Sequence, residues 1–274
     1  MTILIMEIYR GTFNQVRNMI ELGGGMLGID YFGYALIKFD QNTGERSILL
    51  SYAEEGGIRY IGQTEQGVVL FLRGGMILKL KEDLTLERVC TCEYILEVDG
   101  FLEHLTYNMD TREIIFAFTL PAEEVYAIAK QKLGEDEIHL FIKAEETSYF
   151  FDRGLIGFKQ YTFIWGNHEV VAFKGDKYLK KFTSIGIRVF YDRKLGNNFY
   201  SRINSDQVRK YEFREDTDEF VTVYELPCKY AYFGYVVSIL DKSYFIIAGA
   251  TPSPMIIYDI SNDKYQIVEG VNFE

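Results

Sequence analysis

The sequence predicts an all-β protein built from a repeated unit of about 45 residues. Short stretches of alternating apolar and polar residues, rich in Val, Ile, Tyr and Phe, recur with turn residues between them. No segment keeps a helical period over three turns. Repeats of this length with about four strands each are typical of propeller blades. We therefore predict a single closed β-propeller of six four-stranded blades that occupies residues 1–274.

Six hairpins carry the repeat, each consisting of a strand, a polar turn and a second strand. They cover 34–50, 76–90 and 125–142, followed by hairpins that begin at 169, 208 and 255. With turns placed near 40, 81, 130, 174, 214 and 260, the spacings are 41, 49, 44, 40 and 46 residues. Two further strands fit before several hairpins, so we expect each hairpin to supply the third and fourth strands of a blade. The N-terminal segment from Thr2 to Tyr9 should pair with the last blade and close the ring.

Glycines at 23, 25 and 28 match the spelling of a dinucleotide-binding fingerprint, G-x-G-x-x-G. That fingerprint needs a helix to begin within the glycine run, because the helix N-terminus holds the pyrophosphate. The residues that follow, IDYFGYALIKFD, are typical of a strand. We therefore interpret the glycines as positions where inner strands approach one another closely, not as a phosphate site.

Two segments resemble kelch-type or related propeller blades, namely GVVLFLRGGMILKLKEDLTLERV and YFIIAGATPSPMIIYDISNDKYQIVE. In each, a strand ends in small residues and is followed by a strand, an Asp-containing turn and an outer strand. Gly74 and Gly75 reproduce the double glycine of such blades, whereas Trp165 does not occupy the usual place in an outer strand. The resemblance implies the propeller architecture without identifying a subfamily.

The composition is that of an ordinary globular protein, with 48% hydrophobic and 25% charged residues. Three cysteines, two of them separated by a single residue, are a poor disulfide framework. No stretch is long and apolar enough to cross a membrane, and the N-terminal apolar run lacks the features of a signal peptide. We expect a cytoplasmic protein that makes no membrane contact.

The net charge is −11, but the cations are concentrated in one segment. Residues 174–214 contain eleven Lys or Arg and four acidic residues, which leaves about +7 there and about −18 elsewhere. Nucleic acid is not an expected partner, because the overall charge would repel phosphates. An acidic protein partner would instead be attracted to this segment, and the rival explanation is self-association with the acidic hairpin turns. The predicted contact residues are Arg188, Arg193, Lys194, Tyr200, Arg202, Arg209 and Lys210.

No compact catalytic or metal-binding motif is found in the sequence. The three histidines are about 30 residues apart, and there is no nucleophile elbow, so we expect no metal and no organic cofactor. We therefore predict a non-catalytic protein-interaction or scaffold module that uses one propeller face. The alternative is a glycosidase or lyase acting on a carbohydrate or small metabolite, with carboxylates at the axial mouth. Its pocket would contain Arg73, Glu124, Arg153 and His168.

Overall fold

The structure is a computed structural model of the 274-residue chain. It describes residues 16–22, 25–30, 34–40, 45–51, 57–64, 67–72, 76–81, 83, 85–91, 102–120, 125–135, 137–144, 154–166, 169–204, 207–227, 232–239, 242–248 and 255–268. The predicted closing strand from Thr2 to Tyr9 lies outside these residues, so ring closure stays a prediction.

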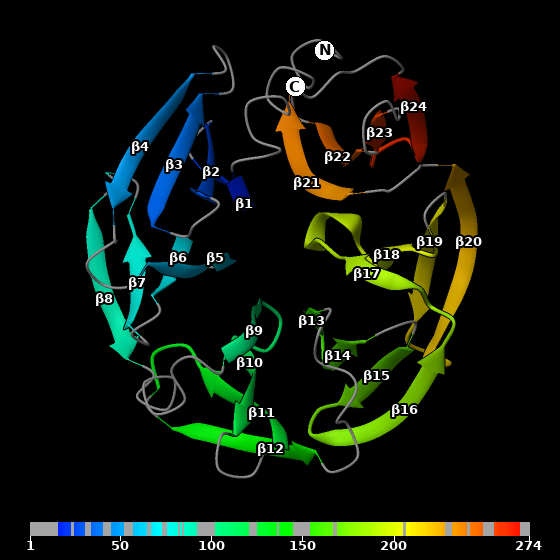
Figure 1. The fold of residues 1–274 in the computed structure, drawn as a ribbon, viewed down its shortest axis with the longest axis horizontal. Coiled ribbons are helices and arrows are strands. Elements are labelled where there is room, and N and C mark those ends of the chain that lie inside the picture. The colour runs from blue at the N-terminus through cyan, green and yellow to red at the C-terminus, as the bar shows by residue number, and fades with distance from the viewer. Residues whose placement is uncertain are drawn as a thin grey trace. The chain divides into compact units, whose positions relative to one another are not determined.

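The described residues form six four-stranded antiparallel sheets, which we number as blades 1 to 6 (Figure 1). Blade 1 consists of β1 (Val16–Leu22), β2 (Gly25–Asp30), β3 (Ala35–Asp40) and β4 (Arg46–Ser51). Blade 2 consists of β5 (Ile58–Thr64), β6 (Gly67–Leu72), β7 (Met76–Leu80) and β8 (Leu86–Thr91). Blade 3 consists of β9 (Leu102–Asn108), β10 (Glu113–Leu120), β11 (Val125–Lys132) and β12 (Ile138–Ala144).

Blade 4 consists of β13 (Gly154–Phe158), β14 (Tyr161–Trp165), β15 (Glu169–Lys174) and β16 (Lys177–Thr183). Blade 5 consists of β17 (Ile187–Phe190), β18 (Asn198–Arg202), β19 (Gln207–Arg214) and β20 (Glu219–Pro227). Its first two strands are joined through a short 3-10 helix, η1 (Arg193–Leu195). Blade 6 consists of β21 (Tyr232–Ile239), β22 (Lys242–Ala248), β23 (Met255–Asp259) and β24 (Lys264–Val268).

Every predicted hairpin is confirmed as the third and fourth strands of a sheet, and the strands of each sheet are hydrogen-bonded in sequence order. In blade 3 the third strand runs to Lys132, so its turn lies a few residues beyond the predicted one. Gly25 and Gly28 belong to strand β2, and no helix begins there, which confirms that the glycine pattern is not a dinucleotide fingerprint.

Close packing divides the chain into two compact units. The first contains blades 1 to 3 together with 155–163 and 173–178, and the second contains 164–172 and the residues from Leu179 onwards. In the first unit, β6 is buried on both of its faces. Val68 and Leu70 pack against the strands of blade 1, whereas Val69 and Phe71 pack against those of blade 3. Side chains alternate between the faces of a strand, so a continuous apolar run fills both interfaces.

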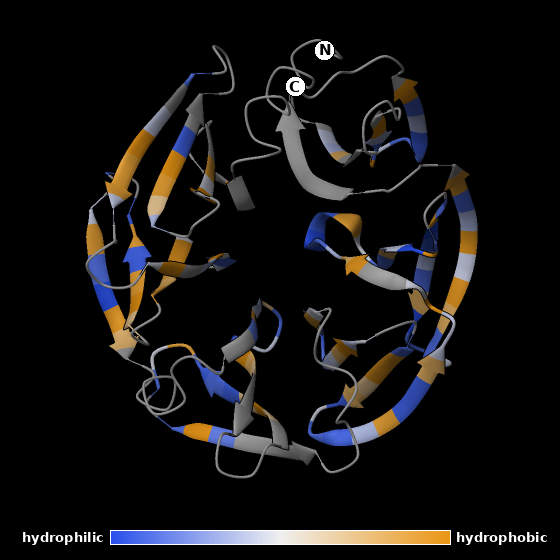
Figure 2. Cartoon of the chain, in the orientation of Figure 1, coloured by the Kyte–Doolittle hydropathy of each residue, from blue (hydrophilic) through white to orange (hydrophobic). Residues whose placement is uncertain are grey.

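The second unit has a comparable core between blades 5 and 6. It includes Tyr200, Val208, Phe245, Ile256 and Tyr258, all less than 5% exposed. The outer strands have a different composition, because one of their faces is solvated. Figure 2 shows hydrophilic and hydrophobic stretches alternating along β16 and β20. No helix in the described part of the chain is long and apolar enough to span a membrane.

Candidate functional site

The predicted contact residues do not share one environment. Arg193 and Lys194 are exposed on η1, and Arg202 is half-buried. Tyr200 and Lys210 are buried in the core of the second unit, at 0% and 4% exposure, and so do not lie on an exposed patch. For Arg188 the structure describes the backbone in β17 but not the side chain.

Carboxylates neutralise much of the charge of the cationic segment. Arg209 donates to Glu225 and to the Tyr211 hydroxyl. Ion pairs between described residues include Lys180–Glu219, Lys181–Glu169, Arg209–Glu225, Lys210–Asp263 and Arg214–Glu212. These ion pairs leave less positive charge for long-range attraction than the sequence count indicates. The second predicted site, Arg73, Glu124, Arg153 and His168, lies outside the described residues.

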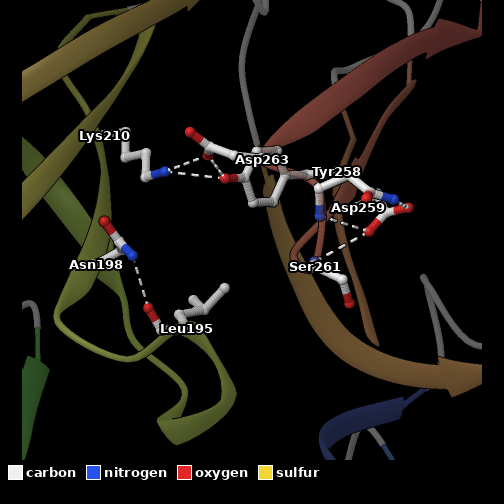
Figure 3. Close-up of polar contacts among 8 residues, drawn as sticks. Leu195, Asn198, Lys210, Tyr258, Asp259, Ser261 and Asp263 are labelled. Carbon is white, nitrogen blue, oxygen red and sulfur yellow. Dashed lines mark hydrogen bonds and ion pairs between the residues drawn. The ribbon is translucent and has the colours of Figure 1, made fainter. Parts of the chain in front are cut away.

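A polar cluster around Lys210 joins blade 5 to blade 6 (Figure 3). The Lys210 Nζ atom, on the third strand of blade 5, lies 2.7 Å from Asp263 Oδ1 and 2.9 Å from the Tyr258 hydroxyl. Tyr258 also donates to Asp263 Oδ1. The side chain of Lys210 is 5% exposed, whereas that of Asp263 is 63% exposed. A buried cation is therefore matched by a carboxylate that reaches it from the surface.

The turn between β23 and β24 positions this carboxylate. Asp259 Oδ1 accepts hydrogen bonds from the backbone N–H groups of Ser261 and Asn262, at 3.0 and 3.2 Å. Asp side chains commonly stabilise turns in this way. Asp263 then adopts a φ of 52°, a left-handed conformation that Asp tolerates better than most residues. The sequence DISND thus both ends one strand and directs Asp263 at Lys210.

Aromatic side chains surround the ammonium group. It lies 5.0 Å from the ring centre of Tyr224 and 5.1 Å from that of Tyr258, within cation–π range. Burial raises the pKa of Tyr200 and raises the pKa of Tyr224 to about 12, and the Asp263 carboxylate adds to both shifts. The two hydroxyls are close enough to affect each other, yet they form no well-directed hydrogen bond, and each lacks a partner among the described residues.

A partly open pocket of about 350 Å³ adjoins this cluster. Its lining combines charged, phenolic and aliphatic groups from blades 5 and 6. The lining residues are Leu195, Asn198, Tyr200, Lys210, Glu212, Val223, Tyr258, Ile260 and Asp263. A volume near 350 Å³ is at the lower end of the range for small-molecule sites.

A second buried lysine forms the same kind of connection in the first unit. Lys130 Nζ, on the third strand of blade 3, lies 3.0 Å from Asp176 Oδ1 and 3.1 Å from the Gly175 carbonyl oxygen, both in the blade 4 hairpin turn. His139 Nε2 is 3.2 Å from the other oxygen of Asp176. We call Lys130–Asp176 and Lys210–Asp263 the two lysine latches.

Tyr200 and Lys210 were predicted as contact residues for a partner, whereas most of the groups around them were not predicted. Tyr258 and Glu212 did not stand out, and Asp263 was predicted only as part of an acidic face of hairpin turns, because their neighbourhood depends on contact between blades. One signal was available, namely a lysine within a third strand followed about one repeat later by an Asp in a hairpin turn. The separations are 46 residues for Lys130 and 53 for Lys210. The described residues include no group of three or more His, Cys, Asp or Glu suited to a metal ion.

Comparison with solved structures shows the fold. A candidate 6-phosphogluconolactonase from Bacteroides uniformis matches with a TM-score of 0.55 and 13% identity, over 90% of this chain and 83% of that one. The Cps50 (Swd1) β-propeller domain of Myceliophteria thermophila matches with a TM-score of 0.60 and 7% identity, over 94% and 88%. An oligogalacturonate lyase solved with manganese matches with a TM-score of 0.58 and 13% identity, over 93% and 78%.

The fold is a six-bladed β-propeller. This confirms the predicted fold class, since the six sheets and the similar propeller domain agree. No family model matches the sequence, and no curated protein matches it, so the resemblance to kelch blades stays a resemblance. The similar structures include both enzymes and a propeller domain without a named reaction. At such identities the likeness concerns the fold alone.

Proposed function

We propose that the protein is a non-catalytic interaction module, and that an extended segment of a partner protein adds to the outer strand β24 of blade 6. The observation that carries this proposal is the exposure of two large apolar residues on that strand. Tyr265 is 48% exposed and Ile267 is 40% exposed. Aromatic and large aliphatic side chains are the usual anchors of protein interfaces.

The register of blade 6 supports this assignment. Tyr265 pairs with Tyr258, and Ile267 pairs with Ile256. Directly opposed residues share one face of a sheet, so Tyr265 and Ile267 extend the face that Tyr258 and Ile256 bury in the core. Within the described residues β24 pairs with β23 alone. A partner strand with apolar residues at alternate positions can use both the edge and the two anchors.

The outer strands of blades 4 and 5 carry more charged residues, or a proline, than β24 does. β16 reads KYLKKFT, and β20 begins with Glu219 and ends with Pro227. Charged residues and proline at sheet edges discourage the addition of further strands. β24 carries one charge, Lys264 at its first position, and reads YQIV after it. Tyr178 on β16 is 60% exposed and therefore provides a matched control residue on a charged edge.

The test compares three forms of the full chain by cross-linking in native extract followed by mass spectrometry. The double variant Tyr265→Lys/Ile267→Lys should lose the cross-linked protein that the wild type retains, because it removes both anchors and places charge on the edge. The control Tyr178→Lys should retain that protein. The proposal fails if the double variant retains it as well.

Hydrogen exchange on the purified complex examines the binding mode directly. Addition of a strand should slow exchange of the backbone amides in 264–268, since the partner's carbonyl groups would accept hydrogen bonds from them. Unchanged exchange in β24 with slowed exchange elsewhere would move the contact to another surface. If the bound protein is a second copy of this chain, sedimentation will show an oligomer that the double variant lacks.

The acidic character of the partner is a further part of this proposal. Arg193 and Lys194 are exposed on η1 in the same compact unit as β24. Such charges speed up the approach of an acidic partner, in a way that salt suppresses. Reversing both to Glu should lower the association rate about tenfold at low salt and have little effect at high salt. A rate that does not depend on salt would remove the acidic requirement and leave the strand contact unaffected.

A further inference from the structure

The pocket beside Lys210 has the chemistry of a small-ligand site that is separate from the β24 edge. We infer that it binds a neutral, polyhydroxylated ring about the size of a monosaccharide. Three features of the pocket support this ligand, namely its size, the charges in its lining, and polar groups that have no protein partner. It does not depend on the identity or existence of a protein partner.

The size and walls of the pocket fit one ring. Its volume of about 350 Å³ leaves room for a single small ligand. Its lining includes two tyrosines, Tyr200 and Tyr258, and three aliphatic residues, Leu195, Val223 and Ile260. Tyrosine rings present an apolar body together with a polar hydroxyl, which suits a ring that carries both C–H and O–H groups.

The charges in the lining disfavour an ionic ligand of either sign. Asp263 is paired with Lys210 and Glu212 with Arg214, so the lining has no excess of either sign that would attract an ion. A ligand with adjacent hydroxyl groups does not need such an excess. It can donate hydrogen bonds to the carboxylates and accept one from Lys210, and such charge-assisted hydrogen bonds are the stronger kind.

Several polar groups in the pocket lining remain available after the protein's own hydrogen bonds are counted. Lys210 has three donor hydrogens, of which Asp263 and Tyr258 take two. Asn198 donates from Nδ2 to the Leu195 carbonyl oxygen, and its Oδ1 receives no donor from the described residues. The Tyr200 hydroxyl is fully buried without a partner. Buried polar groups normally have partners, so an unpartnered one in a pocket lining points to a ligand.

The two lysine latches differ in the second group that accepts a hydrogen bond from the lysine. The second acceptor of Lys130 is the backbone carbonyl oxygen of Gly175, whereas that of Lys210 is the Tyr258 side chain in the pocket lining. Both latches hold a buried lysine, but the Lys210 latch presents its side chains to the pocket.

The experiment is ligand-observed NMR on the full chain with four probes at millimolar concentration: the methyl α-pyranosides of glucose, galactose and mannose, and myo-inositol. At least one should show saturation transfer, whereas inorganic phosphate and L-arginine should not displace it. Binding of myo-inositol alone would assign the site to a cyclitol, and binding of a glycoside alone to a sugar residue. The inference is overturned if none of the four binds, or if either ion displaces the bound probe.

Variants then locate the binding. Glu212→Gln should weaken the bound probe about tenfold, because it replaces a charged acceptor by a neutral one. Tyr200→Phe should weaken it about fivefold through loss of one hydrogen bond. The control Glu219→Gln changes a glutamate that pairs with Lys180 and does not line the pocket, so it should bind as the wild type does. Equal binding by all three variants would place the probe elsewhere and refute the inference.

Discussion

Both lysine latches pair a buried lysine with an aspartate from the next blade. They differ in the other groups that contact the lysine and the aspartate. In each, a lysine on the third strand of one blade is no more than 6% exposed and pairs with an Asp in the third hairpin turn of the next. The residue paired across to the fourth strand is His139 for Lys130 and Tyr224 for Lys210. The first latch is completed by a backbone carbonyl and an exposed imidazole, whereas the second is completed by buried phenols.

The carboxylate is common to both latches, whereas the phenol groups are described for Lys210. A lysine stem can pack within an apolar strand as long as its charged end finds a carboxylate, which both latches provide. The described contacts of the Lys130 latch include a backbone carbonyl oxygen and an exposed imidazole, whereas those of the Lys210 latch include buried phenols. The additional polar groups around Lys210 are therefore the feature that calls for a functional explanation.

The largest expected effect comes from removing either aspartate. Asp263→Ala and Asp176→Ala each leave a buried ammonium group without its carboxylate, and each should lower the free energy of unfolding by about 3 kcal/mol. Chemical denaturation of the two variants measures this directly. If Asp176→Ala costs that much and Asp263→Ala costs under about 1 kcal/mol, water in the pocket replaces the carboxylate, and the two latches are not equivalent.

The next effect concerns alkaline pH and belongs to the Lys210 latch. Burial raises the pKa of Tyr224 to about 12. The unfolded phenol ionises from about pH 10, while the folded one stays protonated, so stability should fall as the pH rises from 10 to 12. Tyr224→Phe should lessen that fall by about 2 kcal/mol, as measured by denaturation across this pH range. A variant that parallels the wild type would show that Tyr224 is hydrated in the folded state.

A smaller effect of opposite sign is expected for Tyr200→Phe at neutral pH. The substitution removes a buried hydroxyl without a partner and should stabilise the protein by about 1 kcal/mol. A gain in stability together with weaker binding of the sugar or cyclitol probe is the pattern expected of a binding-site residue. Destabilisation by more than about 1 kcal/mol would instead show that the hydroxyl has a structural partner, such as an ordered water molecule.

The smallest effect belongs to the exposed end of the Lys130 latch. The side chains of His139 and Asp176 are 66% and 50% exposed, and ion pairs in such positions contribute little. His139→Ala should change the free energy of unfolding by no more than about 0.5 kcal/mol. A larger loss would mean that the imidazole holds Asp176 in place for Lys130, and that both latches depend on the fourth strand.

The sequence by itself determined the fold class, the number of sheets and the position of each hairpin. Two properties made this possible, since side chains alternate strictly along a strand and turns need particular residues. VVLFL in β6 indicated a strand, and DISND indicated a turn. Both signals are local, so they can be read without knowing which blades touch.

Only the tertiary structure decided which charges meet. Lys210 counted toward a cationic surface in the sequence, but it is buried against Asp263, 53 residues away. Lys180 also counted toward that surface, but it pairs with Glu219 from the next blade. Formal charge adds along a chain irrespective of position, whereas electrostatic energy depends on distance and burial, and these follow from the packing of one blade on another.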